Sequence, residues 1–143
     1  MLKNIFGNWR NAVPVYMRVV LGVAFFLYGY QKVFRIGFAG MTKYFATVVG
    51  FPVPMLFGFV ASYLELLGGI ALIIGFQTRW VALLFCIEML VAIFGRHITY
   101  GFFYGPPNNQ GFANVLNLLT MSLTLLILGS GRWSVDKAKG WDE

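Results

Sequence analysis

Four long apolar segments limit what this chain can fold into, because each is close to the length needed to cross a lipid bilayer. They cover residues 13–34, 54–76, 80–98 and 112–128. The hydrocarbon core of a bilayer is about 30 Å thick, so a spanning helix needs roughly 20 largely apolar residues. A signal peptide has a shorter apolar core, so the first segment is interpreted as a retained helix. The sequence predicts an all-α membrane protein, folded as an antiparallel bundle of four transmembrane helices.

The composition agrees with lipid as the surrounding solvent. Hydrophobic residues make up 59% of the 143-residue chain and charged residues only 11%, whereas a soluble domain is about 25% charged. A soluble domain this short could not bury so much apolar surface. The net charge is +6, but the Lys and Arg residues are scattered along the chain and form no basic stripe, so no nucleic-acid partner is expected. We therefore predict a single membrane domain over residues 1–143.

The segments between the spans carry signals for loops and turns. Residues 35–53 are expected to be a polar, aromatic connection, and residues 77–79 a tight turn between two antiparallel spans. Residues 100–110 are rich in Gly, Pro and Asn, a composition typical of a loop. Residues 132–143 are expected to be a mobile polar tail.

The distribution of basic residues predicts the orientation of the chain. Four spans place both termini on one side of the membrane, and cytoplasmic segments carry an excess of Lys and Arg. We therefore expect cytoplasmic termini in a bacterial or archaeal cell membrane. The side with the termini would carry Lys3, Arg10, Arg79, Arg132, Lys137 and Lys139, and the other side Lys32, Arg35, Lys43 and Arg96.

Small and polar residues repeat at helical spacing within three of the spans. Residues three or four positions apart share a helix face, and Gly and Ser let helices approach closely in lipid. We expect these faces to point into the bundle. They comprise Arg18, Gly22, Phe25, Gly29 and Lys32 in the first span, Gly58, Ser62, Glu65, Gly69 and Leu72 in the second, and Asn114, Asn117, Met121 and Thr124 in the fourth.

Two carboxyl groups are predicted to lie deep in the membrane. At about 1.5 Å per residue, Glu65 lies roughly 16 Å into its span and Glu88 roughly 12 Å into the next. Such residues are costly in lipid unless they are paired or functional. Arg18 is the expected partner of Glu65, in either a structural ion pair or a site for a ligand or a proton. Glu88 is expected to be protonated and hydrogen-bonded to the fourth span, since burial disfavours the charged form.

The other ionisable residues define the candidate site. Arg96 and His97 lie at the end of the third span, where they would serve either as interfacial anchors or as part of the site. A single Cys86 and a single His97 offer no thiol relay, no bis-histidine haem and no metal cluster. The sequence therefore predicts no metal, haem or flavin. The candidate catalytic residues are Glu65, Arg18 and His97, and the candidate cofactor-binding residues are Lys32, Glu88, Asn114 and Asn117.

Several motifs, taken in order, resemble those of the DoxX family of small bacterial and archaeal membrane proteins. The resemblance implies a compact four-helix bundle and an oxidoreductase role, because the family takes its name from a subunit of an archaeal thiosulfate:quinone oxidoreductase. The motifs are Arg18-x-x-Leu21-Gly22, Gly29-x-x-Lys32, Glu65-Leu66-Leu67-Gly68-Gly69, Leu72-x-x-Gly75-x-x-Thr78-Arg79, His97 and Gly129-x-Gly131-Arg132-x-Ser134-x-Asp136.

The chain also departs from the family pattern. The family often has an acidic residue early in the fourth span, but here Gly111-Phe112 is followed by Ala113. An apolar residue is usual at the position of Glu88. One interpretation is that the acidic group has moved from the fourth span to the third; the other is that this member has a different function.

These features leave three functions open. A quinone-linked oxidoreductase subunit would need an apolar slot with hydrogen-bonding and proton-carrying groups, and its electrons would come from elsewhere. The alternative is a non-catalytic accessory or structural subunit of a larger membrane complex, with a protein partner or further copies of itself. A transporter ranks last, because four short helices leave little room for a pore and no inverted repeat is visible.

Overall fold

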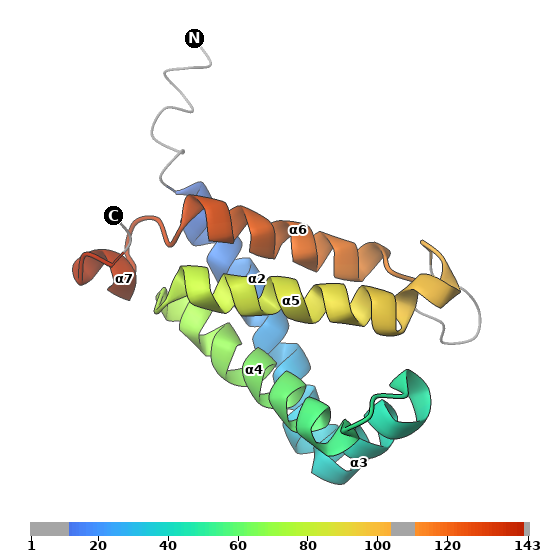
Figure 1. The fold of residues 1–143 in the computed structure, drawn as a ribbon. Coiled ribbons are helices and arrows are strands. Elements are labelled where there is room, and N and C mark those ends of the chain that lie inside the picture. Colours follow the sequence, from blue (N-terminus) through green and yellow to red (C-terminus); the bar gives the residue numbers. More distant parts are fainter. Residues whose placement is uncertain (1–11, 104–110, 142–143) are drawn as a thin grey trace.

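The computed structural model describes residues 12–103 and 111–141, and within them the chain forms helices and no strands (Figure 1). The four principal helices are α2 (Val13–Tyr30), α4 (Pro54–Ile74), α5 (Thr78–Gly95) and α6 (Ala113–Leu128). The predicted all-α bundle is confirmed. Residues 104–110 of the predicted loop lie outside the described part of the chain.

Three of the helical segments are long and apolar enough to cross a membrane. They are the continuous helical run Val13–Val49, together with Pro54–Ile74 and Thr78–Gly95. The fourth predicted span is present as the apolar helix α6, whose 16 residues extend about 24 Å at 1.5 Å per residue. By length, α6 falls somewhat short of the roughly 30 Å hydrocarbon core.

The connection predicted over residues 35–53 is largely helical, which the sequence interpretation did not foresee. The chain continues from α2 as a π-helical turn (Gln31–Ile36), α3 (Gly37–Tyr44) and a second π-helical turn (Phe45–Val49). A π-helical turn redirects a helix without ending it, and Gly37 has a positive φ of 74° at the first one. As a result α3 folds against α4, at the end of the bundle opposite the chain termini (Figure 1).

Glycines set the close packing of α2 on α4. A Cβ added to Gly29 would lie 2.2 Å from the Leu66 nitrogen, and one added to Gly69 would lie 2.5 Å from the Phe26 nitrogen. The small-residue faces predicted for the first two spans therefore form a helix–helix contact, as expected for packing in lipid. The second main contact, between α5 and α6, is joined to the first by the stacked rings of Phe25 and Phe85, whose centroids are 3.7 Å apart.

The polar ladder predicted on the fourth span faces the bundle only in part, since Met121 packs against the core and Thr124 is half-buried. Asn114 and Asn117 are exposed, and α6 instead buries Val115, Ser122 and Leu125. Small and apolar side chains pack more closely on α5 than carboxamides would. The Thr hydroxyls on α6 satisfy themselves within their own helix, since those of Thr120 and Thr124 donate to the carbonyl oxygens four residues earlier at 2.9 and 2.8 Å.

The predicted polar tail folds onto the bundle over the residues that are described, up to residue 141. It contains the short helix α7 (Val135–Ala138), and Asp136 within it is buried. The two carboxylate oxygens of Asp136 accept hydrogen bonds from the backbone nitrogens of Gln77 and Thr78 at 2.6 and 2.7 Å. A carboxylate is stabilised at the start of a helix by such free N–H groups, so the start of α5 holds the tail.

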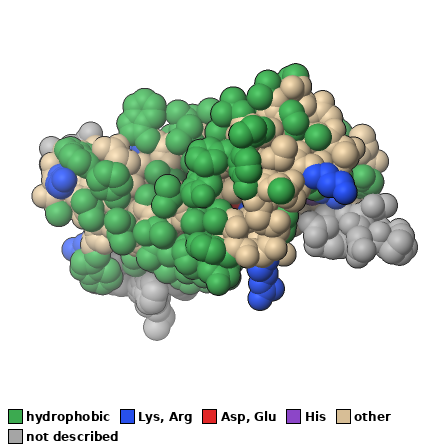
Figure 2. All heavy atoms as spheres, turned by 90° about the horizontal axis from the view of Figure 1, so that it is seen from below, with side chains coloured by type: hydrophobic (Ala, Val, Ile, Leu, Met, Phe, Trp, Pro, Cys, Tyr) green, Lys and Arg blue, Asp and Glu red, His purple; other side chains and the backbone are tan. Residues whose placement is uncertain are grey.

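The surface of the molecule is largely apolar, as a lipid environment requires. Figure 2 shows one face on which hydrophobic side chains dominate and Lys and Arg lie toward the margins. Large side chains such as Leu67 and Phe94 are 60% and 68% exposed. Soluble monomers rarely expose apolar surface on this scale, and three helical segments are long and apolar enough to cross a membrane, so the molecule is a multi-pass membrane protein.

Candidate functional site

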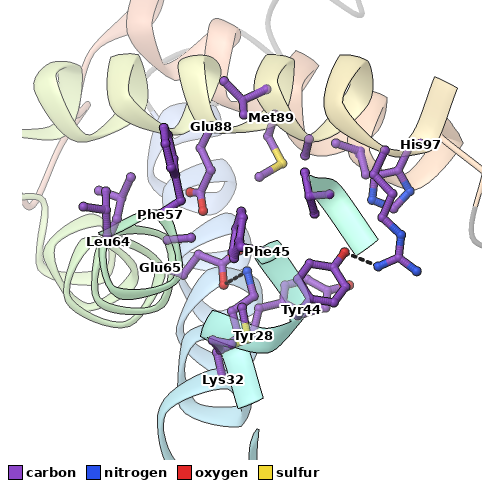
Figure 3. Close-up of a pocket in the computed structure, with 18 of the residues that line it drawn as sticks. Tyr28, Lys32, Tyr44, Phe45, Phe57, Leu64, Glu65, Glu88, Met89 and His97 are labelled. Atoms are coloured by element: carbon purple, nitrogen blue, oxygen red, sulfur yellow. Dashed lines mark hydrogen bonds and ion pairs between the residues drawn. The ribbon is translucent and has the colours of Figure 1, made fainter. Parts of the chain in front are cut away.

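A pocket of about 450 Å³ lies between α2, α3, α4 and α5, with α6 contributing to one wall (Figure 3). Most of its lining is apolar or aromatic, including Phe45, Phe57, Leu64 and Met89. Ligand sites are commonly concave, of 300–1,000 Å³, and apolar with a few well-placed polar groups. The polar groups here are the charged residues that the sequence placed within the membrane.

Lys32 and Glu65 form an ion pair inside this pocket, with Nζ and Oε2 2.6 Å apart. Lys32 comes from the π-helical turn after α2, and Glu65 from the middle of α4. The Glu65 side chain is 5% exposed and that of Lys32 is 25% exposed. An ion pair shielded from water is stabilised when its geometry is close, as here, and costly to break.

The predicted partner of Glu65, Arg18, is wrong. Gly29 packs against the backbone of Glu65, so the register of α2 on α4 places Lys32, one turn further on, beside the carboxylate. Arg18 precedes Lys32 by 14 positions, or about 21 Å along a helix. The helical spacing correctly placed both cations on the inner face of the first span, but it could not supply the register between two helices.

Arg18 instead belongs to the end of the bundle that carries the termini. Its guanidinium is buried and donates a hydrogen bond to the backbone oxygen of Trp133. It lies against Gly75, where an added Cβ would come within 1.8 Å of its Nη1, and it interacts electrostatically with Asp136. Arg18 does not line the pocket, so the structure does not bring this candidate catalytic residue together with Glu65.

Glu88 projects from α5 into the pocket, toward the side where Phe45 and Glu65 lie (Figure 3). The hydrogen bond predicted between Glu88 and the fourth span is absent from the described residues, and its Oε2 atom is buried without a hydrogen-bond partner. Lys32 interacts electrostatically with both Glu65 and Glu88. Lys32 is thus close enough to attract both carboxyl groups, but only Glu65 forms an ion pair with it.

A second polar group lies in the pocket just beyond the C-terminal end of α5. Arg96 donates a hydrogen bond to the hydroxyl of Tyr44, and its guanidinium lies 4.8 Å from the centroid of the Tyr44 ring and 5.9 Å from that of Tyr100. His97 also lines the pocket here. Arg96 and His97 are therefore parts of the pocket wall, and a catalytic role for His97 stays a prediction.

The two candidate asparagines separate in the structure. Asn114 lines the pocket and donates a hydrogen bond to the Tyr28 hydroxyl at 3.2 Å. Asn117 is exposed on the outer side of α6 and does not line the pocket. Sequence reasoning missed Tyr28 and Tyr44 as polar groups of the site. The signal for Tyr44 was weak, because it lies in the segment interpreted as a polar, aromatic connection between spans.

The pocket combines three kinds of chemistry within apolar walls. Lys32, Arg96 and the two Tyr hydroxyls can donate hydrogen bonds, the Glu carboxyls can accept them, and an intramembrane carboxyl can also exchange a proton. Such a site suits a flat, largely apolar molecule with a few oxygen atoms.

Comparisons with known proteins agree with this fold. A family model described as DoxX matches residues 13–98. The chain is 32% identical over 136 residues to "Inner membrane protein YphA" of Escherichia coli (strain K12), covering 92% of this chain and 94% of that protein. It is also 32% identical over 77 residues, or 54% of each chain, to "Putative oxidoreductase CatD" of Bacillus subtilis (strain 168). No solved structure matches the chain.

Proposed function

This chain belongs to the DoxX family, and we propose that it binds a quinone in the pocket as a subunit of a membrane oxidoreductase. One observation carries the proposal: an apolar pocket of about 450 Å³ in a multi-pass membrane protein encloses the Lys32–Glu65 pair and the unpartnered Glu88 carboxyl. Ionisable residues at such depth are a functional-site hypothesis by default.

The pocket meets the chemical needs of a quinone. The ring and its tail require apolar walls, which Phe45, Phe57 and Leu64 provide. The carbonyl oxygens require hydrogen-bond donors, and reduction to the hydroquinone requires protons. Lys32 can donate to a carbonyl oxygen, and Glu88 can deliver a proton because no other described residue holds its Oε2 atom.

The electrons would come from a partner subunit. We infer this from the chain's own residues, which carry no recognised motif for a redox cofactor. The local similarity to a protein whose name includes "oxidoreductase" supports a redox role. The partner would be a different polypeptide or a further copy of this chain.

We further propose that the termini face the cytoplasm in a bacterial or archaeal cell membrane. The excess of Lys and Arg on the side of the termini supports this orientation, and the name of the E. coli relative refers to an inner membrane. The Arg96 end of the pocket would then face away from the cytoplasm.

The test is to purify the full chain from its native membranes in mild detergent and to measure the quinone that travels with it. Ala61→Phe adds bulk inside the pocket, whereas Ile70→Phe adds the same ring to an exposed position on the same helix outside it. We expect stoichiometric quinone with the wild type and with Ile70→Phe, and a loss of at least tenfold with Ala61→Phe. Equal quinone in all three samples would contradict the proposal.

A specific observation favours the alternative of a non-catalytic accessory subunit. The Lys32–Glu65 pair joins the first span to α4 beside the tight contact at Gly29, so it can stabilise the packing of these two helices. Glu65→Gln separates the two functions. If the variant stays in the membrane at wild-type levels but loses quinone, the pair is functional; if the protein disappears from the membrane, the pair is structural.

A further inference from the structure

The Arg96 end of the pocket holds a cation that no described carboxylate neutralises. The guanidinium is framed by the rings of Tyr44 and Tyr100, and one of its nitrogens donates to the Tyr44 hydroxyl. Its Nε atom is buried and has no hydrogen-bond partner. Within residues 12–103 and 111–141, the ion pair in the pocket is the one between Lys32 and Glu65.

This arrangement leaves a strong donor unpaired in the wall of an apolar cavity. A buried N–H without an acceptor costs free energy, and a charged one costs more. The aromatic rings offset part of the cost through cation–π contacts, but they do not accept the Nε hydrogen bond. A ligand oxygen that carries negative charge would satisfy it, because the planar guanidinium matches such oxygens well.

The opposite end of the pocket differs in charge. There Glu65 takes up the charge of Lys32 at 2.6 Å, and Glu88 adds a second carboxyl group. Arg96 follows Glu88 by eight positions, or about 12 Å along a helix. The carboxyl end carries no unpaired positive charge, so an acidic ligand would be attracted to Arg96, and the two ends of the pocket differ in charge along α5.

We infer that Arg96 and the Tyr44 hydroxyl form an oxyanion subsite, which takes a carboxylate or phenolate oxygen of an apolar aromatic ligand. Arg96 donates to that oxygen through its free guanidinium N–H groups. The Tyr44 hydroxyl, which accepts from Arg96, keeps its own proton available for the same oxygen. The inference rests on the same pocket as the proposed function but goes beyond it, because it names an anionic aromatic ligand, whereas a quinone is neutral.

Three matched probes test the subsite by titration calorimetry of the full chain in one detergent. 4-Decylbenzoate carries the anionic oxygens, 4-decylbenzyl alcohol is its neutral counterpart, and a decyl benzoquinone tests the proposed function. Arg96→Gln removes the charge, and Tyr44→Phe removes only the hydroxyl. Arg35→Gln is the matched control, because Arg35 is exposed and does not line the pocket.

We expect Arg96→Gln to weaken benzoate binding about tenfold or more, as for a hydrogen bond to a charged group. Tyr44→Phe should weaken it about threefold or more, and binding of the alcohol should change by less than about twofold in both variants. Arg35→Gln should match the wild type. Equal benzoate affinity in the wild type and in Arg96→Gln would overturn the inference. If Arg96→Gln fails to fold, Tyr44→Phe decides, and an unchanged affinity there overturns the inference.

The quinone probe separates the two proposals. Benzoate binding that depends on Arg96, without quinone binding, would support the subsite and contradict the proposed function. Quinone binding without benzoate binding would support the proposed function and contradict the subsite. If the wild type binds neither probe, both proposals are wrong.

Discussion

The two ends of the bundle both bury charged side chains, but they treat them in opposite ways. At the end with the termini, both carboxylate oxygens of Asp136 accept backbone hydrogen bonds, and the buried Arg18 guanidinium is pressed against Gly75. At the other end, Glu88 and Arg96 face a cavity of about 450 Å³ and keep polar atoms without partners.

Both ends contain buried polar atoms without hydrogen-bond partners. The ends differ in whether the charged side chain lines a cavity. Arg18 has two unpartnered nitrogens, Nε and Nη1, but it does not line the pocket, and its guanidinium packs against Gly75 and the backbone oxygen of Trp133. A buried charge with no adjacent space can only hold the fold together, whereas a buried charge beside a cavity can meet a ligand. This comparison predicts that mutations at the first end change stability, and mutations at the second end change binding.

The largest expected effect is at the packed end, in Gly75→Ala. Gly75 ends α4 with φ 71° and ψ 46°, and a Cβ there would collide with Arg18. We expect a loss of about 3–5 kcal/mol in unfolding free energy, from the left-handed backbone and the overpacking together. Thermal unfolding in detergent measures the loss.

Gly50→Ala is a matched control for this prediction. Gly50 ends its helical turn with φ 73° and ψ 30°, and an added Cβ would meet nothing within 4 Å. It should cost only the backbone part, about 1–2 kcal/mol. Equal losses in the two variants would show that the contact with Arg18 adds nothing.

A smaller effect is expected for Asp136→Asn at the same end. The substitution removes the charge that stabilises the start of α5 and one of the two acceptors used by Gln77 and Thr78. We expect a loss of about 1–3 kcal/mol and faster hydrogen exchange at these two backbone amides. Binding at the pocket should stay at the wild-type level, and a change in ligand affinity would mean that the two ends are coupled.

At the pocket end, we expect Glu88→Gln to change ligand binding more than stability. The carboxyl has no hydrogen-bond partner among the described residues, so replacing it by an amide of similar shape should change stability by less than about 1 kcal/mol. Quinone binding should fall about tenfold, since the carboxyl group, which can share a proton with the ligand, is replaced by an amide that cannot. Glu65→Gln is the comparison, because it strands Lys32 and should lower stability more. A large loss of stability in Glu88→Gln would assign Glu88 to the fold.

The sequence predicted the bundle and the residues of the pocket more reliably than it predicted their pairing. Apolar length and small-residue spacing depend on one helix at a time, so the spans and the α2–α4 contact could be predicted. The choice between Arg18 and Lys32 as partner of Glu65 depends on the register between two helices, which is set by Gly29. The docking of Asp136 depends on the start of a helix 58 positions earlier in the chain.

The smallest effect is expected for Asn117→Leu, because Asn117 is exposed although the sequence placed it inside the bundle. Asn117 is exposed on α6 and lines no part of the pocket, so its replacement should change stability by no more than about 0.5 kcal/mol and leave ligand affinity unchanged. Asn114→Leu provides the contrast, because it removes the hydrogen bond to Tyr28 in the pocket wall. Thermal unfolding and quinone titration of the two variants, side by side, measure the difference. A larger effect for Asn117→Leu than for Asn114→Leu would mean that another molecule covers the outer face of α6 in the membrane. That face would then be a third functional surface, in addition to the two ends of the bundle.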